Sequence, residues 1–279
     1  MLAPGKLPGR VGGNPDLPGA HPMAIPVAID PIAFHLGLMP IRWSALAYPA
    51  TLIACAIALF RLQKREQLLP PGPWPFDLCV WVAVGIFIGA RLGEVLLYRP
   101  AYFAAHPFEI FTLHQGGMAS HGALLGAAIA TVMFARRSGI DSWLLLDAVA
   151  VAAPFGFLFA RIGNFIDGLP QGSVTLVPWA VIHLAIDLLP RHPVQLYQAA
   201  GEGVLLLLLL IAFPYPRYGF GSRAAWACIA YGSIRIVMEN FKTVEPGPGI
   251  AATGIRNGQL YSLVLIAVGV VIAWKRRFR

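Results

Sequence analysis

Five charged side chains stand in stretches of sequence that are otherwise apolar enough to lie in a membrane. They are Arg91, Glu94, Glu202, Arg235 and Glu239. A charge at the centre of a bilayer costs at least about 2.5 to 3.5 kcal/mol on insertion scales, so such residues normally face a protein interior or a wet cavity and serve a function. We therefore expect the chemistry of this protein at these positions.

The spacing of two polar groups places each of them along one face of a helix. Tyr231, Arg235 and Glu239 follow one another at intervals of four, which puts a phenol, a guanidinium and a carboxylate within mutual reach. This set could serve a substrate, or it could be an ion pair that only satisfies itself. A second stripe follows the same logic and consists of Gln195, Gln198 and Glu202.

The stretch from Arg161 to Gly172 combines an arginine with several glycines and follows an apolar run that ends near residue 160. We predict an irregular segment here, with Arg161 and Asn164 in a turn at the helix end. An arginine held in this way can bring its planar fork and nearby backbone N–H groups onto a phosphate. The alternative is a turn that is merely capped and satisfied.

His121 is a candidate for proton transfer. It follows Gly116, Gly117 and Met118 and stands just inside an apolar run. Histidine is the side chain whose unperturbed pKa lies near neutral pH. A histidine in such a position can also be a helix-end residue whose hydrogen bonds are satisfied.

The composition indicates which elements must position these side chains. Hydrophobic residues make up 57% of the chain and charged residues 12%, whereas charged residues are about a quarter of a soluble domain. The sequence predicts an all-α integral membrane protein, because lipid offers no partner for free backbone groups and the alternation typical of a barrel is absent. We expect about seven transmembrane helices, each needing about 17 to 25 residues, at 45–60, 77–98, 118–135, 143–160, 194–213, 223–241 and 259–274.

The basic residues predict how these helices are oriented. Alternating sides along the chain gathers most basic clusters on one face, which the positive-inside rule makes cytoplasmic. The N-terminus and segments 99–117, 161–192 and 242–257 then lie outside, and the C-terminus is cytoplasmic. The net charge of +8 comes largely from these clusters and requires no nucleic acid. The clusters hold Arg61, Lys64, Arg65, Arg136, Arg137, Arg217, Arg223, Lys275, Arg276, Arg277 and Arg279.

The first thirty residues differ in composition from the rest of the chain. Residues 1–30 are rich in glycine and proline, and we predict that they are disordered. They also lack the basic start, apolar run and cleavage site of a secretory signal. Translation starting at Met23 is an alternative. Residues 31–279 are then expected to form a single transmembrane catalytic domain.

Small residues in the apolar runs are predicted to serve packing. Glycine recurs at every fourth position, which lets neighbouring helix backbones approach closely in lipid. The two stripes are Gly85, Gly89 and Gly93, and Gly122 with Gly126. The three cysteines lack metal-ligand spacing and are expected to be small buried hydrophobic side chains. They are Cys55, Cys79 and Cys228.

An ordered series of motifs from about Ile29 to Trp274 resembles the bacterial prolipoprotein diacylglyceryl transferase family. The series is too dense to arise by chance. Its members are Gly-Ala-Arg-Leu-Gly at 89–93, Gly-Gly-Met-Ala-Ser-His-Gly at 116–122, Pro-Phe-Gly at 154–156, Arg-Ile-Gly-Asn-Phe-Ile at 161–166, Arg-His-Pro-Val-Gln-Leu-Tyr at 191–197, Tyr-Gly-x-x-Arg-x-x-x-Glu at 231–239 and Gly-Gln at 258–259. The resemblance implies seven membrane helices with an outside N-terminus, in agreement with the orientation drawn from charge.

The resemblance also implies a reaction in the bacterial inner membrane. The diacylglyceryl group of phosphatidylglycerol passes to the lipobox cysteine thiol of a prolipoprotein signal peptide, forming a thioether and releasing glycerol phosphate, with no cofactor and no metal. Catalytic roles are implied for His121, Arg161, Asn164, Tyr231, Arg235 and Glu239. Substrate-binding roles are implied for Arg91, Gly122, Asp167, Gly172, Gln195, Tyr197, Glu202 and Gln259.

Physical needs of that reaction suggest individual roles within this set. Donors must lie where charge builds on the leaving phosphate, and the candidates are Arg161, Arg235 and Asn164. The thiol, with a usual pKa of about 8.5, must lose a proton. His121 is best suited to take it, and Tyr231 could act instead or position the lipid. Glu239 is expected to orient Arg235.

The sequence departs from the family pattern at three positions. Ser44 stands where the family has a tyrosine, and Ala123 where it has a glycine. Leu169 stands where the family has a glutamate, so Asp167 would have to supply a carboxylate from two positions away. Two other interpretations therefore stay open: a relative that binds phosphatidylglycerol but uses another acceptor or does not turn over, and a transporter. No repeat between the two halves of the chain supports the transporter.

Overall fold

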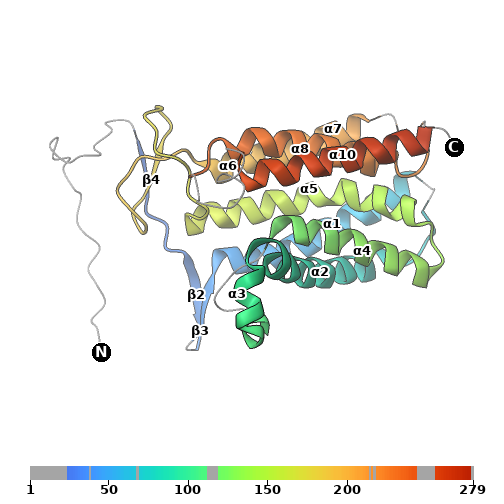
Figure 1. Cartoon of the computed structure of the whole chain (residues 1–279), viewed down its shortest axis with the longest axis horizontal. Coiled ribbons are helices and arrows are strands. Elements are labelled where there is room, and N and C mark those ends of the chain that lie inside the picture. Colours follow the sequence, from blue (N-terminus) through green and yellow to red (C-terminus); the bar gives the residue numbers. More distant parts are fainter. Residues whose placement is uncertain are drawn as a thin grey trace.

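The computed structural model describes residues 24–37, 39–66, 69–111, 119–213, 215, 218–243 and 255–277. Most of these residues are helical, and the long helices run side by side along the longest axis of the molecule (Figure 1). The helical segments are α1 (Trp43–Glu66), α2 (Trp74–Gly93), η1 (Glu94–Tyr98), α3 (Pro100–Ala105), η2 (Pro107–Phe111), α4 (Ser120–Ser138), α5 (Ser142–Asp167), α6 (Val194–Gln198), η4 (Ala199–Leu205), α7 (Leu206–Ala212), α8 (Ser222–Glu239) and α10 (Asn257–Arg277).

Five of the described helices are long and apolar enough to cross a membrane. They span Trp43–Glu66, Trp74–Tyr98, Ser142–Asp167, Val194–Ala212 and Asn257–Arg276. The helices α4 and α8 are 19 and 18 residues long and are not among these five. The expectation of a mostly helical, multi-pass membrane protein is confirmed, whereas seven spans and the sides of the termini stay predictions.

The helix α5 is longer than predicted, and the expected turn at Arg161 and Asn164 is wrong. Both residues lie inside α5, which ends at Asp167 and is followed by Gly168 with a φ of 72°. The glycine at 163 serves packing instead of a turn, because a Cβ there would lie 2.9 Å from the Cα of Ser44 on α1. The small residue lets α5 and α1 approach closely, as small residues do between membrane helices.

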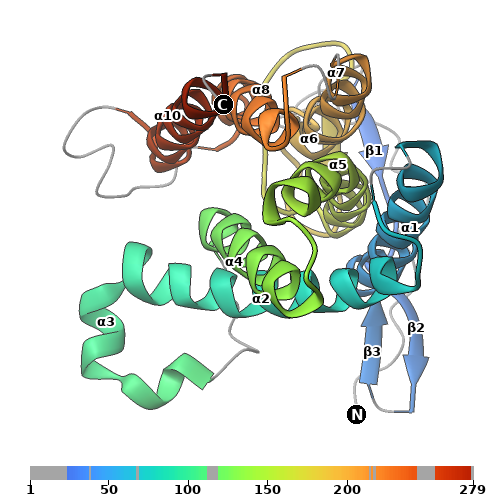
Figure 2. The same ribbon diagram turned by 90° about the vertical axis from the view of Figure 1, so that its right-hand side faces the viewer.

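The two glycine stripes line the contact between α2 and α4, which lie side by side in the end-on view (Figure 2). A Cβ built on Gly126 would lie 2.0 Å from the carbonyl oxygen of Gly85. One built on Gly122 would lie 2.2 Å from that of Gly89. Any larger residue would push the backbones apart, so the prediction that these glycines serve helix packing is confirmed.

A buried carboxylate stabilises the end of the bundle at which α8 begins. Asp147 on α5 is 1% exposed and accepts hydrogen bonds from the backbone N–H groups of Gly221 and Ala224, both at 2.7 Å. These N–H groups belong to the first turn of α8, where a helix lacks partners of its own. The acid therefore caps α8 from a neighbouring helix.

Short strands lie at the other end of the bundle, which we call the strand end (Figure 1). Strand β1 (Ile25–Val27) pairs in parallel with β4 (Val181–His183), and β2 (Ile32–Leu36) pairs antiparallel with β3 (Met39–Arg42). The all-α prediction did not include these two small sheets. Strand β1 also falls in the segment predicted to be disordered, of which residues 1–23 lie outside the described residues.

The cysteines sit in helices as free thiols. Cys79 is buried, and Cys55 and Cys228 are half-buried. The thiol of Cys55 donates to the carbonyl oxygen of Ala152 at 3.3 Å. Within the described residues, no three His, Cys, Asp or Glu side chains gather as a metal site would require.

Candidate active site

The centre of the polar interior is Glu202, a carboxylate with no exposed surface. Its Oε2 accepts from Nε and Nη2 of Arg161 at 3.1 and 2.9 Å. Its Oε1 accepts from Nη1 of Arg235 at 2.9 Å. The three side chains come from η4, α5 and α8, so the contact ties three helices together. A carboxylate buried this deeply needs such charge-assisted bonds, because isolated burial would cost several kcal/mol.

The neighbouring charges leave this cluster with an excess of positive charge. Glu239 lies 3.9 Å from Nη2 of Arg235 and 3.2 Å from Nζ of Lys242. Three cations, Arg161, Arg235 and Lys242, thus face two carboxylates, Glu202 and Glu239, which leaves one net positive charge at their usual ionisation. A buried surplus of this kind suits an anionic ligand such as a phosphodiester.

Arg235 has two acidic partners. The contact with Glu239 that the spacing on α8 predicts is present at 3.9 Å, and Glu202 makes a shorter one at 2.9 Å. The helices η4 and α8 are in close contact at this point, where a Cβ on Gly201 would lie 2.9 Å from Ile234. Packing between helices therefore adds a second partner to the neighbour along one helix.

Tyr231 lies on the predicted face of α8, on the side of Arg235 that is nearer the start of the helix. Its ring is 5% exposed and stacks on Phe157 of α5, with centroids 4.7 Å apart and an interplanar angle of 18°. It lies four residues before Arg235, so the phenol belongs to the same polar interior. The structure therefore brings Tyr231 close to the cluster that the sequence predicts.

His121 lies in the first turn of α4 and faces α10. Its ring centroid is 4.9 Å from that of Tyr261, and its Nδ1 is buried with no hydrogen-bond partner among the described residues. The alternative of a satisfied helix-end histidine is therefore not what the structure presents at Nδ1. A buried ring nitrogen without a partner is costly to maintain unless a ligand or water completes it.

Arg91 joins the bundle to a segment that extends from its side. Its guanidinium donates to the carbonyl oxygens of Glu109 and Ile110. These carbonyls belong to the segment formed by α3 and η2, which extends sideways from the bundle (Figure 2). The Glu94 carboxylate accepts from Nε of Arg99 at 2.8 Å.

A second tier of polar groups lies between the charged cluster and the strand end. Gln198 is fully buried, and neither atom of its amide has a hydrogen-bond partner among the described residues. Gln195 donates from Nε2 to the carbonyl oxygen of Pro170 at 2.9 Å, while its Oε1 has no such partner. Asn164 stands three residues after Arg161 on α5, towards the same end.

The acidic candidate Asp167 pairs with Arg42 of β3, with Oδ1 and Nε 3.6 Å apart. Its Oδ1 is buried and has no hydrogen-bond partner within the described part of the chain. Leu169 is 55% exposed and points away from the interior. The carboxylate at 167 thus has a buried oxygen, while the side chain at 169 is exposed.

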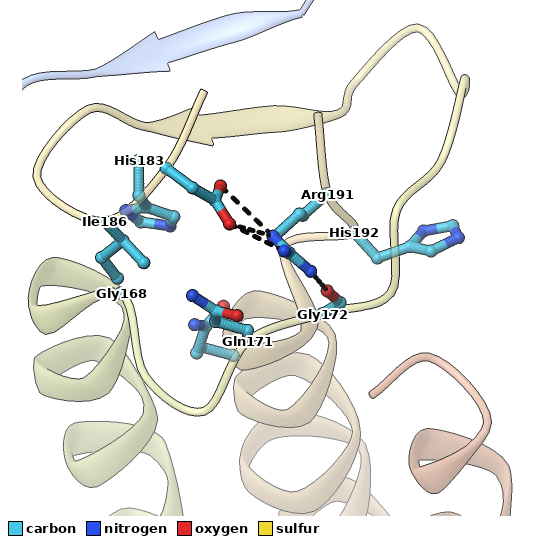
Figure 3. Close-up of a pocket in the computed structure, with 9 residues that line it drawn as sticks. Gly168, Gln171, Gly172, His183, Ile186, Arg191 and His192 are labelled. Carbon is cyan, nitrogen blue, oxygen red and sulfur yellow. Dashed lines mark hydrogen bonds and ion pairs between the residues drawn. The ribbon is translucent and has the colours of Figure 1, made fainter. Parts of the chain in front are cut away.

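The loop after α5, residues 168–193, encloses a small cavity of about 10 Å³. Figure 3 shows Arg191 bridging this loop: it binds Asp187 at 2.7 Å and the carbonyl oxygen of Gly172 at 2.9 Å. The Arg191 guanidinium holds the pKa of the Asp187 carboxyl below its usual value. Gly172 has no room for a side chain, since a Cβ would lie 2.0 Å from the carbonyl oxygen of His192.

The remaining predicted residues lie further from the charged cluster. The hydroxyl of Tyr197 accepts from Nε1 of Trp179 at 2.6 Å and lies 3.2 Å from Nδ1 of His192. Gln259 bonds Asn240 at 3.3 Å at the start of α10. Gly122 packs on α2, Ser44 lies against Gly163, and Ala123 contributes a backbone bond in the first turn of α4.

The sequence reasoning missed three residues that shape the site. Lys242 pairs with Glu239, and its spacing of three from that residue was a usable signal. Arg191 stands at the head of the motif at 191–197, yet its bonds to Asp187 could not be inferred without the loop conformation. Arg42 reaches Asp167 only because β3 folds back beside the end of α5.

Comparisons with known proteins give a consistent result. Residues 31–275 match the family described as prolipoprotein diacylglyceryl transferase. A protein of Methylocella silvestris is 41% identical over 259 residues, covering 90% of this chain and 94% of that protein. One of Aromatoleum aromaticum is 38% identical, covering 89% and 96%, and one of an Azoarcus species is 37% identical, covering 90% and 96%. All three are named phosphatidylglycerol–prolipoprotein diacylglyceryl transferase.

Proposed function

The chain belongs to the prolipoprotein diacylglyceryl transferase family, and from this premise we propose that it transfers the diacylglyceryl group of phosphatidylglycerol to a prolipoprotein. The acceptor is the lipobox cysteine of the signal peptide. Its sulfur forms a thioether with the terminal glyceryl carbon, the bond from that carbon to the phosphate oxygen breaks, and glycerol phosphate leaves. The thiol proton passes to a base of the enzyme.

One observation supports this proposal more than any other: two guanidinium groups share one buried carboxylate, that of Glu202. Glu202 holds Arg161 and Arg235 in place without a ligand. Two positive charges face one negative charge, so the group can bind an anion. A phosphodiester that becomes a phosphate monoester gains negative charge as it leaves, so preorganised cations stabilise the transition state more than the bound lipid.

His121 is the proposed base for the cysteine thiol. A thiol is a weak nucleophile until it loses its proton. The unpartnered Nδ1 of His121 is a buried ring nitrogen able to accept that proton. Tyr231, which stacks on Phe157, is proposed to contact and position the lipid and not to act as the base.

We also propose seven spans with the strand end outside the inner membrane. The pairing of β1 with β4 requires residues 27 and 181 to lie on one side, which needs an even number of crossings between them. Helices α1, α2, α4 and α5 supply four. The bridge between Gly172 and Lys242 likewise requires two crossings, by α6–α7 and by α8. Helix α10 then adds the last one and leaves the C-terminus on the cytoplasmic side.

The direct test is a transfer assay with purified protein in vesicles. We expect a lipobox peptide to gain a diacylglyceryl thioether, detected by mass, when the vesicles contain phosphatidylglycerol. A peptide with serine in place of the cysteine is the matched control and should remain unmodified. Binding of phosphatidylglycerol without transfer would favour a non-catalytic lipid-binding protein, and neither binding nor transfer would refute the proposal.

A further inference from the structure

Gln198 carries a feature that phosphate binding does not explain. Its side chain has no exposed surface, and both its Nε2 and its Oε1 lack hydrogen-bond partners in the described residues. Burying an amide without partners costs roughly 1 to 3 kcal/mol by mutational data, so native proteins rarely keep one without a ligand or water to complete it. The amide is therefore a candidate contact for a bound molecule.

Two contacts fix the level of Gln198 in the bundle. Nearer the bundle centre, Glu202 binds Arg161; nearer the strand end, Gln195 binds the carbonyl oxygen of Pro170. Gln198 lies between Glu202 and Gln195 along its helix. On the facing segment, Asn164 lies on α5 between Arg161 and the helix end at Asp167, which Pro170 follows. The two uncharged amides thus share the level directly above the guanidinium groups.

The polar groups at the level of Gln198 are neutral, whereas those at the neighbouring level towards the bundle centre are charged. Below Gln198 are the guanidinium groups of Arg161 and Arg235, which suit a phosphate. At the level of Gln198, the groups that await partners are an amide N–H donor and an amide oxygen acceptor. A hydroxyl matches both because it accepts one hydrogen bond and donates another. An ammonium only donates, and the surplus positive charge below would repel it.

From this order of groups we propose that Gln198 recognises a hydroxyl of the glycerol headgroup of phosphatidylglycerol and thereby selects this lipid over donors whose headgroup lacks hydroxyls. The inference rests on the proposed function and adds the determinant of its donor specificity. Arg161 and Arg235 bind the phosphate, and the neutral amide of Gln198 binds the headgroup glycerol that is attached to it. Gln195 supports this level from the strand end through its bond to Pro170.

The test pairs one change in the enzyme with one change in the lipid. Transfer to a lipobox peptide is measured with phosphatidylglycerol and with phosphatidylpropanol, which keeps the phosphodiester but lacks the hydroxyls. Wild-type protein should prefer phosphatidylglycerol by at least about tenfold in kcat/KM, because an analogue without the hydroxyl leaves buried polar groups unpaired. Gln198→Met, which keeps the length of the side chain, should bring that ratio close to one.

Gln63→Met is the matched control, since Gln63 lies near the far end of α1 and donates to the carbonyl oxygens of Pro70 and Gly72. It should keep the wild-type ratio. An equal loss with both lipids in Gln198→Met would overturn the proposal and make Gln198 a packing residue, while transfer itself would stand. Should Gln198→Met fail to fold, the wild-type ratio still decides: a value near one refutes hydroxyl recognition. Turnover of neither lipid would refute the proposed function instead.

Discussion

Glu202 determines how the two arginines of the site can act. Its oxygens accept from both guanidinium groups, so neither Arg161 nor Arg235 is free to rotate towards solvent when the site is empty. Their remaining N–H groups are left for a ligand. Holding the groups in place before binding removes the cost of ordering them during the reaction.

Replacing either arginine with lysine should therefore abolish most activity although the charge is kept. Lysine offers one compact ammonium instead of a planar fork, so it cannot keep the guanidinium contact with Glu202 and also present a two-pronged donor to a phosphate. We expect Arg161→Lys and Arg235→Lys each to lower kcat/KM at least about a hundredfold, or ~2.7 kcal/mol of barrier. Arg99→Lys, on an arginine whose side chain is 48% exposed, is the control. Near-normal transfer in both site variants would exclude a role that depends on guanidinium geometry.

Asp167 is the residue on which the departure at Leu169 can be tested. If its carboxylate takes the place of the acid that the family has at 169, Asp167→Ala should slow transfer at least about tenfold, or ~1.4 kcal/mol. Leu169→Ala should change little, because that side chain is 55% exposed. The rates come from initial velocities with a lipobox peptide. Full activity in Asp167→Ala would show that no acid is needed at this end of α5.

At the scale of elements, the loop of residues 168–193 depends on one ion pair. Asp187 has a lowered pKa because Arg191 donates hydrogen bonds to it. A lowered folded-state pKa stabilises the loop above the unfolded value of about 3.9, and the stabilisation is lost as pH falls through the folded value. The amides of Val181 and Arg191, each bonded to the other's carbonyl at 2.9 Å, report on it. Their hydrogen-exchange protection should be unchanged from pH 6 down to pH 5 and should fall below about pH 3.9, and in Asp187→Asn it should be low throughout.

The backbones of α2 and α4 approach so closely at their glycines that the contact should not accept a methyl group. A Cβ on Gly126 would lie 2.0 Å from the carbonyl oxygen of Gly85. Overpacking of this kind typically costs about 1 to 3 kcal/mol. Gly126→Ala should therefore lower Tm in detergent. The neighbouring Leu125 is 63% exposed on the lipid side, and Leu125→Ala should leave Tm nearly unchanged. Equal Tm values in the two variants would contradict the packing role.

The sequence predicted the existence of the long helices well and their ends less well. The apolar runs predict the spans Trp74–Tyr98 and Val194–Ala212 to within a few residues, because lipid imposes one rule on every spanning segment. The extension of α5 was missed since Arg161 and Asn164 look like a terminus until Glu202 supplies a partner. The strands were missed because elements of three to five residues are determined by tertiary pairing. Contacts across helices, such as Arg235 with Glu202, depend on packing that no single-helix spacing contains.

For the whole molecule, the main prediction is its sidedness. From the basic clusters near residues 61–65, 136–137 and 275–279 we expect a cytoplasmic C-terminus. The strand pairing brings residues 25–27 and 181–183 together, and we expect both on the opposite side. Reporters that are active on only one side of the membrane, fused after residue 279 and inserted between residues 175 and 185, should give opposite signals. Equal signals at the two sites would refute seven crossings.

The pairing of β1 with β4 also sets an order of events during synthesis. The partners are separated by more than half of the chain, since Ile25 pairs with Val181. At about 5 to 20 residues per second, the ribosome needs roughly 10 to 30 s to make the intervening segment. During that interval β1 has no β4 to pair with, and its edge stays open. The strand that comes first in the chain can thus complete its sheet only after the helices α1, α2, α4 and α5 have been made, so the strand end of the bundle is completed late in synthesis.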